Sequence, residues 1–173
     1  MIISNSSPLI LLAKINKLEV LKKLYGNVFI PRQVYNEVII QGKNENYSDA
    51  ALVEKYINEF IFVKDLNAER NKEAEKLNKI VGSGESQAIE LCLQETAELL
   101  LIDNFEPRKL AQLKEIKCRS TPGILLEALK KEIIKFEEYN SAIMELSKYA
   151  WLSGDVVAHF IDAGNKIKQG ELK

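Results

Sequence analysis

The sequence is poor in the residues that build thiol and imidazole sites. Its 173 residues include one histidine, His159, and two cysteines, Cys92 and Cys118. A single histidine excludes sites built from several histidines, and the two cysteines lack the C-x-x-C spacing of zinc and redox motifs. His159 stands among apolar residues in a predicted helix, and the cysteines fall in a predicted helix and a predicted strand. We therefore expect structural roles for all three, with the cysteines as buried thiols.

Long apolar runs and an excess of one charge are also absent. No apolar run approaches the ~18 residues that span a membrane, and the first residues lack the basic and long apolar regions of a signal peptide. The 24 Lys and Arg residues balance 25 Asp and Glu residues, for a net charge of -1. Any contact with nucleic acid must therefore be local. These features predict a soluble, cytoplasmic protein with no membrane partner.

Short apolar segments alternate with segments of helical periodicity. They predict strands at residues 2–4, 28–30, 61–63, 99–102 and 116–119. Strands separated by helices indicate a parallel sheet, so we predict an α/β fold of three layers, with about five strands and helices on both faces. The length fits one domain of residues 1–173, with a core of about 1–132 and a helical extension of about 133–173.

Local signals mark where several helices begin. Ser7 followed by Pro8 predicts an N-cap and a proline at the first helical position. Residues 41–47 are polar and predict a loop. The Gly-Ser-Gly segment at residues 82–84 lacks the Gly-Lys-Ser/Thr ending of a P-loop, so we interpret it as the turn that precedes Glu85.

Four polar residues are candidates for one site at the edge of the sheet. Asn5 follows the first strand, Asp103 follows the fourth, Glu85 opens the helix that leads to the fourth strand, and Glu37 lies on the helix after residue 31. Parallel sheets bind ligands beyond the carboxyl ends of their strands, and a site of oxygen ligands suits Mg²⁺ or Mn²⁺. Each residue also has a local explanation as a turn residue, a helix cap or a solvated acid.

Four ordered segments carry a resemblance to a known family. IISNSSPLILLAKI, FIPRQVYNEV, GSGESQAIELC and LLLIDN together resemble the PIN domain, in the branch whose first motif is Ser-Asn-Ser/Thr-Ser-Pro-Leu. The resemblance covers about the first 130 residues, and the later GILLEAL helix and C-terminal helical pair are similar to that branch as well.

The resemblance implies a ribonuclease that depends on a divalent metal, Mg²⁺ or Mn²⁺, and that is often the toxin of a toxin–antitoxin pair. Asn5 takes the place of the first Asp, and Glu37, Glu85 and Asp103 match the three further acids, which would be catalytic. The other implied positions are Ser7, a hydroxyl beside the first ligand, and Asn104, a further polar residue. With Asn5 neutral, three carboxylates replace four, which lowers the expected metal affinity.

The remaining expectations concern partners. Arg108 and Lys109 follow Asp103 closely and are the basic residues best placed for a substrate phosphate. The expected partners are RNA, an antitoxin protein and a second copy of the chain. The C-terminal region from Ile143 to Phe160 is richly apolar and could form the surface for the protein partners, although covering the core is the simpler interpretation of that region. Two alternatives remain open. One is a catalytically weakened module that binds RNA or a protein, and the other is a receiver-like α/β fold, which lacks support because no acidic pair follows the first strand.

Overall fold

The computed structural model describes residues 1–171, so the last two residues of the expected C-terminal extension lie outside the described part. Five short strands form one parallel sheet in the order β3-β2-β1-β4-β5. They are β1 (Ile2–Ser4), β2 (Val28–Pro31), β3 (Ile61–Lys64), β4 (Leu99–Leu101) and β5 (Cys118–Arg119). The predicted α/β fold with a five-stranded parallel sheet is confirmed.

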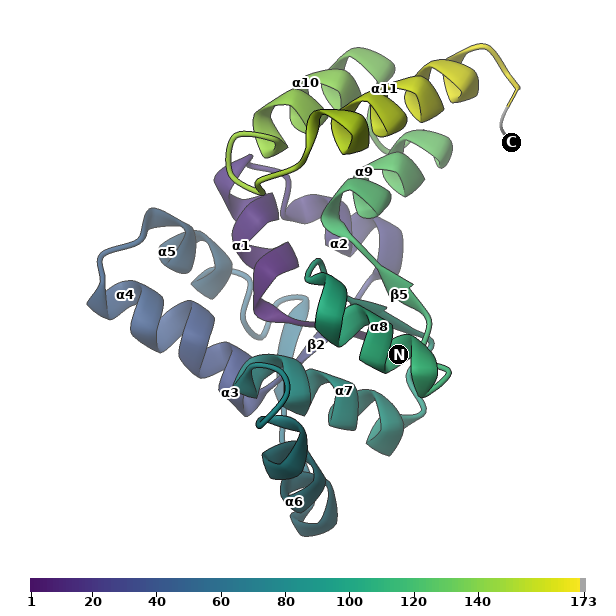
Figure 1. Ribbon diagram of the computed structural model, residues 1–173. Helices are drawn as coiled ribbons and strands as arrows, with labels where there is room; N and C mark the ends of the chain where they lie inside the picture. Colours follow the sequence, from purple (N-terminus) through teal and green to yellow (C-terminus); the bar gives the residue numbers. More distant parts are fainter. Residues whose placement is uncertain (172–173) are drawn as a thin grey trace.

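Helices occupy the connections between strands (Figure 1). The first part of the chain contains α1 (Ser6–Lys14), α2 (Glu19–Tyr25), α3 (Arg32–Tyr35), the π-helix η1 (Asn36–Gln41), α4 (Gly42–Asn44), α5 (Ser48–Glu54) and α6 (Ala68–Leu77). The second part contains α7 (Ser83–Glu95), α8 (Phe105–Leu113), α9 (Thr121–Lys130), α10 (Phe136–Leu146) and α11 (Gly154–Lys168).

The prediction of a loop at residues 41–47 was wrong for its first half. Helical backbone continues through η1 and α4 as far as Asn44. Gly42 lies so close to Ala50 of α5 that a Cβ on Gly42 would be 2.8 Å from the Cβ of Ala50. Packing of α4 against α5 therefore stabilises a segment whose polar sequence by itself predicts a loop.

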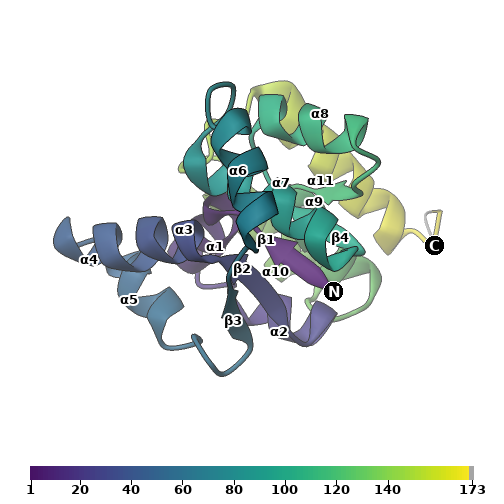
Figure 2. The same cartoon turned by 90° about the horizontal axis from the view of Figure 1, so that it is seen from below.

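The two faces of the sheet contact different helices, because successive side chains of a strand point to opposite faces. On one face, Ile3 and Leu100 pack with Ile89 of α7. On the other face, Val28 and Leu101 belong to a larger core cluster that includes side chains of α1, α2 and α9. Figure 2 shows the strands with α7 and α8 to one side and α2 to the other. This is the arrangement of three layers that the sequence predicts.

The C-terminal helices α10 and α11 lie beside α9 (Figure 1). Tyr139 of α10 is completely buried in the larger core cluster, and its hydroxyl donates a hydrogen bond to the carbonyl oxygen of Phe160 at 2.7 Å. Gly164 of α11 packs directly on the Tyr139 ring. Among residues 1–171, no helix combines the length and the apolar character that crossing a membrane requires.

Candidate functional site

The ends of β1 and β4 bring Asn5 and Asp103 to the same edge of the sheet. These two strands pair in parallel, with Ser4 opposite Leu101, and the Asn5 N–H donates to the Leu101 carbonyl oxygen at 3.0 Å. Asp103 follows two residues after Leu101. The sequence argument that polar residues at neighbouring strand ends share one rim therefore agrees with the geometry of the sheet.

Asn5 is the N-cap of α1 and is only 3% exposed. Its backbone is extended, and its side-chain Oδ1 accepts a hydrogen bond from the N–H of Ser6. The prediction that Ser7 caps this helix was wrong, because the helix begins at Ser6 and the capping side chain is the one before it. Pro8 then takes the third helical position, where a backbone N–H has no partner inside the helix.

Glu37 is held by four donors. Its Oε2 accepts from the Ser6 hydroxyl at 2.5 Å, while Oε1 accepts from the Gly84 N–H at 2.9 Å, the Ser83 hydroxyl at 3.2 Å and the Gln33 amide at 3.4 Å. Glu37 stands in the π-helix η1, a local widening that is frequent at functional sites. These contacts join the starts of α1 and α7 across the rim.

Glu85 connects the start of α7 to the loop after β4. One carboxylate oxygen accepts from the Gly82 N–H at 2.9 Å, and the other accepts from the side-chain amide of Asn104. Asn104 is also the N-cap of α8, next to Asp103 in the chain. The structure thus places Glu85 beside the Asp103 loop, as the sequence argument requires.

Asp103 faces the start of α9. One carboxylate oxygen accepts from the Thr121 N–H at 2.7 Å and the other from the Thr121 hydroxyl at 2.8 Å. Burial raises the pKa of Asp103 and outweighs the opposing effects of the Thr121 hydrogen bonds, the nearby Ser7 hydroxyl and the positive charge of Arg108. A nearby cation would stabilise the ionised form of such a buried carboxylate and so lower its pKa.

One pattern unites the four candidate ligands: each accepts a backbone N–H at the start of a helix. The pairs are Asn5 with Ser6, Glu37 with Gly84, Glu85 with Gly82, and Asp103 with Thr121. The first N–H groups of a helix have no partner inside it and carry partial positive charge, which explains why carboxylates are stable there. The starts of α1, α7 and α9 therefore converge on one rim, and its acids are positioned by backbone as well as by side chains.

Ser7 is the polar side chain at this rim that remains without a partner. Its hydroxyl oxygen is buried and makes no hydrogen bond of ordinary geometry within residues 1–171; the Asp103 carboxylate is its polar neighbour, and the Ser7 hydroxyl lowers the pKa of that acid. Buried hydroxyls are normally hydrogen-bonded, so a water or an ion ligand at this point would satisfy it. The predicted position of Ser7 beside the ligands agrees with this geometry.

The carboxylate and amide oxygens at the rim are the kind of atom that a hard cation binds. Among residues 1–171, each oxygen of Asp103 and of Glu85 accepts one hydrogen bond and so retains one lone pair, as does Oε2 of Glu37, whereas Oε1 of Glu37 accepts three hydrogen bonds. Within the same residues, no three His, Cys, Asp or Glu side chains are close enough together to hold an ion as they stand. Each of the three acids therefore keeps an oxygen of the kind that Mg²⁺ or Mn²⁺ binds, and Glu37 is the acid that accepts the most hydrogen bonds.

A cleft of about 770 Å³ opens beside Asp103 and separates it from the C-terminal segment. Ser7, Asn104 and Arg108 line it together with Asp103, whereas Lys109 lines a second hollow of about 540 Å³ toward β5. Arg108 lines both hollows, and Lys109 lines only the second. Arg108 faces the candidate site, and its proximity is the reason its charge lowers the pKa of Asp103.

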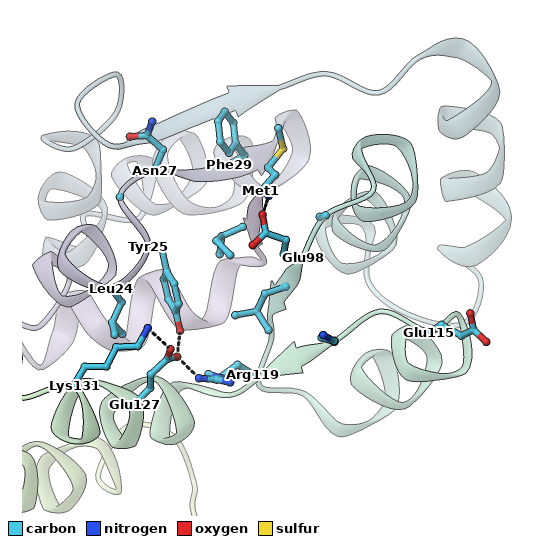
Figure 3. Close-up of a pocket in the computed structure, with 15 residues that line it drawn as sticks. Met1, Leu24, Tyr25, Asn27, Phe29, Glu98, Glu115, Arg119, Glu127 and Lys131 are labelled. Carbon is cyan, nitrogen blue, oxygen red and sulfur yellow. Dashed lines mark hydrogen bonds and ion pairs between the residues drawn. The ribbon is translucent and has the colours of Figure 1, made fainter. Parts of the chain in front are cut away.

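A larger cavity, of about 980 Å³, lies at the opposite, amino ends of the strands (Figure 3). There Glu127 accepts from the Tyr25 hydroxyl at 2.7 Å and pairs with Lys131 at 2.9 Å and with Arg119. Glu127 is thus paired within the protein. Ligands of parallel sheets bind at the carboxyl ends of the strands, so we place the candidate site in the smaller cleft.

The residues expected to be structural differ in their surroundings. Cys92 is buried, and burial raises the pKa of its thiol; burial also raises the pKa of Cys118, to about 11. The prediction of a buried thiol is confirmed for Cys92, whereas Cys118 is only half-buried. His159 instead lines the cleft beside Asp103.

Sequence reasoning missed the residues that hold the acids, chiefly Ser6, Ser83 and Thr121. A usable signal was present for Thr121, since Ser120-Thr121-Pro122 follows β5 as Ser6-Ser7-Pro8 follows β1. No local signal identifies Ser83 as a partner of Glu37, because the two residues are 46 positions apart.

Comparison with known proteins agrees with this architecture. No curated protein and no solved structure matches the chain. The model of the family DUF3368, described as a PIN domain, matches residues 1–166, which is nearly the whole chain. The chain therefore belongs to the PIN-domain family, a family of nuclease-type modules.

Proposed function

We propose that this protein is an endoribonuclease that depends on a divalent metal and hydrolyses phosphodiester bonds in RNA. The observation that supports this most is the rim itself, where Asn5, Glu37, Glu85 and Asp103 are each fixed by an N–H at a helix start. Membership in the PIN-domain family supports a nuclease. The unpaired Ser7 hydroxyl beside Asp103 supports a site that takes a further polar group.

The residues have distinct roles in this proposal. Asp103, Glu85 and Oε2 of Glu37, which retain lone pairs, would hold Mg²⁺ or Mn²⁺, and Asn5 would add a neutral oxygen. When bound, such an ion would supply Lewis-acid chemistry, namely activation of a water and compensation of the negative charge that develops on the phosphate oxygens. Glu37 keeps the starts of α1 and α7 in place, so that these ligands stay at one rim. Arg108 attracts the substrate phosphate into the cleft.

The test is cleavage of RNA by the full chain with Mn²⁺ and with a chelator, comparing the parent with Asp103→Asn. We expect chelation to abolish cleavage and Asp103→Asn to reduce it by more than about 100-fold, because even residues one step removed from a metal cost about 10- to 100-fold. Asp162→Asn is the matched control, since Asp162 only forms an exposed pair with Lys166. Equal metal-dependent cleavage in Asp103→Asn and the parent would refute the assignment.

A second candidate is a catalytically weakened module that binds RNA or a protein partner. The state of Asn5 favours it, because Oδ1 already accepts the Ser6 N–H and brings no charge to the site. Asn5→Asp separates the two candidates cleanly, since Asp caps a helix as well as Asn does. If the protein is an active enzyme, calorimetric titration with Mn²⁺ will show tighter binding and the variant will cleave faster. A module without catalysis predicts no Mn²⁺ binding by the parent and RNA binding that a chelator does not change.

The resemblance leads us to propose further that the protein is the toxin of a toxin–antitoxin pair. Induced expression should then arrest bacterial growth, and Asp103→Asn should relieve the arrest. Normal growth with the parent protein, at matched expression, would contradict the toxin role without affecting the ribonuclease proposal.

A further inference from the structure

The cleft beside Asp103 has a second wall made from the C-terminal segment. Residues 149–152 of the turn after α10 and side chains from the first half of α11 line this wall, and Ser7, Asp103 and Arg108 line the facing side. Figure 1 shows the turn before α11 lying close to α1. The candidate hydrolytic site is therefore continuous with a surface that the four PIN motifs do not include.

Aromatic side chains on this wall are exposed to an extent that folding does not explain. Trp151 is 98% exposed and Tyr149 is 43% exposed. Trp151 also has a φ of 49°, in the left-handed region that bulky residues seldom adopt. Neighbouring apolar residues behave differently, since Ala150, Leu152 and Phe160 pack against the core. The segment thus presents Trp151 and Tyr149 to the cleft together with Val156, which is 37% exposed, while the other apolar residues of the wall are partly buried.

Two cations line the same cleft without an acidic partner. Lys14 and Arg108 form no ion pair within residues 1–171, and the Lys14 ammonium lies 5.7 Å from the centre of the Tyr149 ring. The acids of the cleft are Asp103, which belongs to the candidate site, and Asp155 at the start of α11. Exposed rings beside free cations are the two elements that bind single-stranded nucleic acid: bases stack on the rings and phosphates pair with the cations.

We propose that Trp151 and Tyr149 form a stacking platform for the bases of single-stranded RNA, while Lys14 and Arg108 bind its phosphates next to Asp103. This inference rests on the proposed function in taking RNA as the ligand, and it specifies unpaired RNA as the substrate class. Bases of a duplex are stacked on one another and do not reach the rings. A protein partner is less suited to this wall, because an apolar face laid over it would bury the charges of Lys14 and Arg108 without a counter-charge.

Trp151 provides the assay, since it is the only tryptophan of the chain. Its emission is measured during titration with a single-stranded RNA of roughly 12 nucleotides, in chelator to prevent cleavage, and with the same RNA annealed to its complement. We expect quenching by the single strand and little change with the duplex. In anisotropy titrations with labelled RNA, Trp151→Ala should bind about 10- to 100-fold more weakly. Tyr47→Ala is the matched control, because Tyr47 is a 55% exposed aromatic residue next to α5, away from the cleft.

Several outcomes would overturn the platform. The first is binding of the single-stranded RNA without quenching of the Trp151 emission. The second is equal affinity of Trp151→Ala and Tyr47→Ala for that RNA. The third is a parent protein that sediments as a dimer and becomes a monomer in Trp151→Ala. Because Trp151 is almost fully exposed, its replacement leaves the fold intact. Cleavage in Mn²⁺ is measured separately. Quenching without cleavage contradicts the proposed enzyme and supports the platform, whereas metal-dependent cleavage at the parent rate by Trp151→Ala contradicts the platform and supports the enzyme.

Discussion

Replacing Gly84 with alanine tests whether the start of α7 fixes Glu37. Gly84 is the second residue of α7, and its N–H donates to Glu37 Oε1 at 2.9 Å. A Cβ on Gly84 would lie 2.7 Å from that oxygen and 2.8 Å from the carboxyl carbon. Contacts this short are not tolerated, so the carboxylate must move away and lose the hydrogen bond from the Gly84 N–H.

Two opposing effects set the change in the free energy of unfolding that Gly84→Ala causes. Replacing glycine with alanine at an unstrained position stabilises a protein by about 0.4–1 kcal/mol, chiefly by restricting the unfolded chain. Losing a hydrogen bond to a charged group costs about 1.5–3 kcal/mol, and the lower end applies here because Glu37 is half-buried and water can replace part of the contact. When the shifted carboxylate also loses the Ser83 hydroxyl, the cost exceeds the gain. We expect Gly84→Ala to lower the free energy of unfolding by about 1–2 kcal/mol.

The assay is urea unfolding followed by circular dichroism, with Gly154→Ala as the matched control. Gly154 is the first residue of α11, and a Cβ there would meet nothing within 4 Å. We expect this control to be unchanged or up to about 1 kcal/mol more stable. The two glycine replacements should therefore differ in sign, and only Gly84→Ala should reduce RNA cleavage. Equal stability of the two variants, with parental cleavage in both, would refute the role assigned to the Glu37–Gly84 contact.

Two further predictions concern regions outside the rim. Burial opposes ionisation of Glu127, but Lys131, Tyr25 and Arg119 together lower its pKa below the usual value. The ionised carboxylate therefore stabilises the fold at neutral pH, and this stabilisation is lost as the pH falls through the lowered pKa. In urea unfolding between neutral pH and about pH 3, Glu127→Gln should lose less stability than the parent, and parallel losses would contradict this. Gly164→Ala would place a Cβ 2.9 Å from Tyr139 Cδ1. The resulting overpacking between α10 and α11 should lower the free energy of unfolding by about 1–3 kcal/mol and increase amide hydrogen exchange in α11. Exchange at the parental rate would show that this contact is not needed to dock α11 on α10.

The order of strands and helices could be predicted from the sequence because the signals are local. An apolar run such as Leu99–Leu101 predicts a buried strand from its own composition, and helical periodicity depends only on spacing. Errors occurred where a contact from elsewhere decided the outcome. Residues 41–44 are helical because Gly42 packs on Ala50, and α1 begins one residue before Ser7 because Asn5 caps it.

The candidate site was predictable in its members but not in its connections. Asn5 and Asp103 follow strands that a parallel sheet brings together, so their proximity follows from topology alone. The carboxylate of Glu37 is different, because its donors come from Ser6 and from Gly84, a residue 47 positions away. No spacing rule relates such positions.

The sequence by itself determined the α/β class, the strands and the polar residues at their ends, since apolar pattern and helix-start chemistry act over a few residues. Only the tertiary structure decided that the starts of three helices hold those polar side chains, that Ser7 remains unpaired, and that Trp151 faces solvent in the same cleft as Arg108 and Asp103. The physical reason is that these features depend on how helices pack across the sheet and how α10 and α11 dock on α9. Packing of that kind joins residues far apart in the chain, and a local pattern does not encode it.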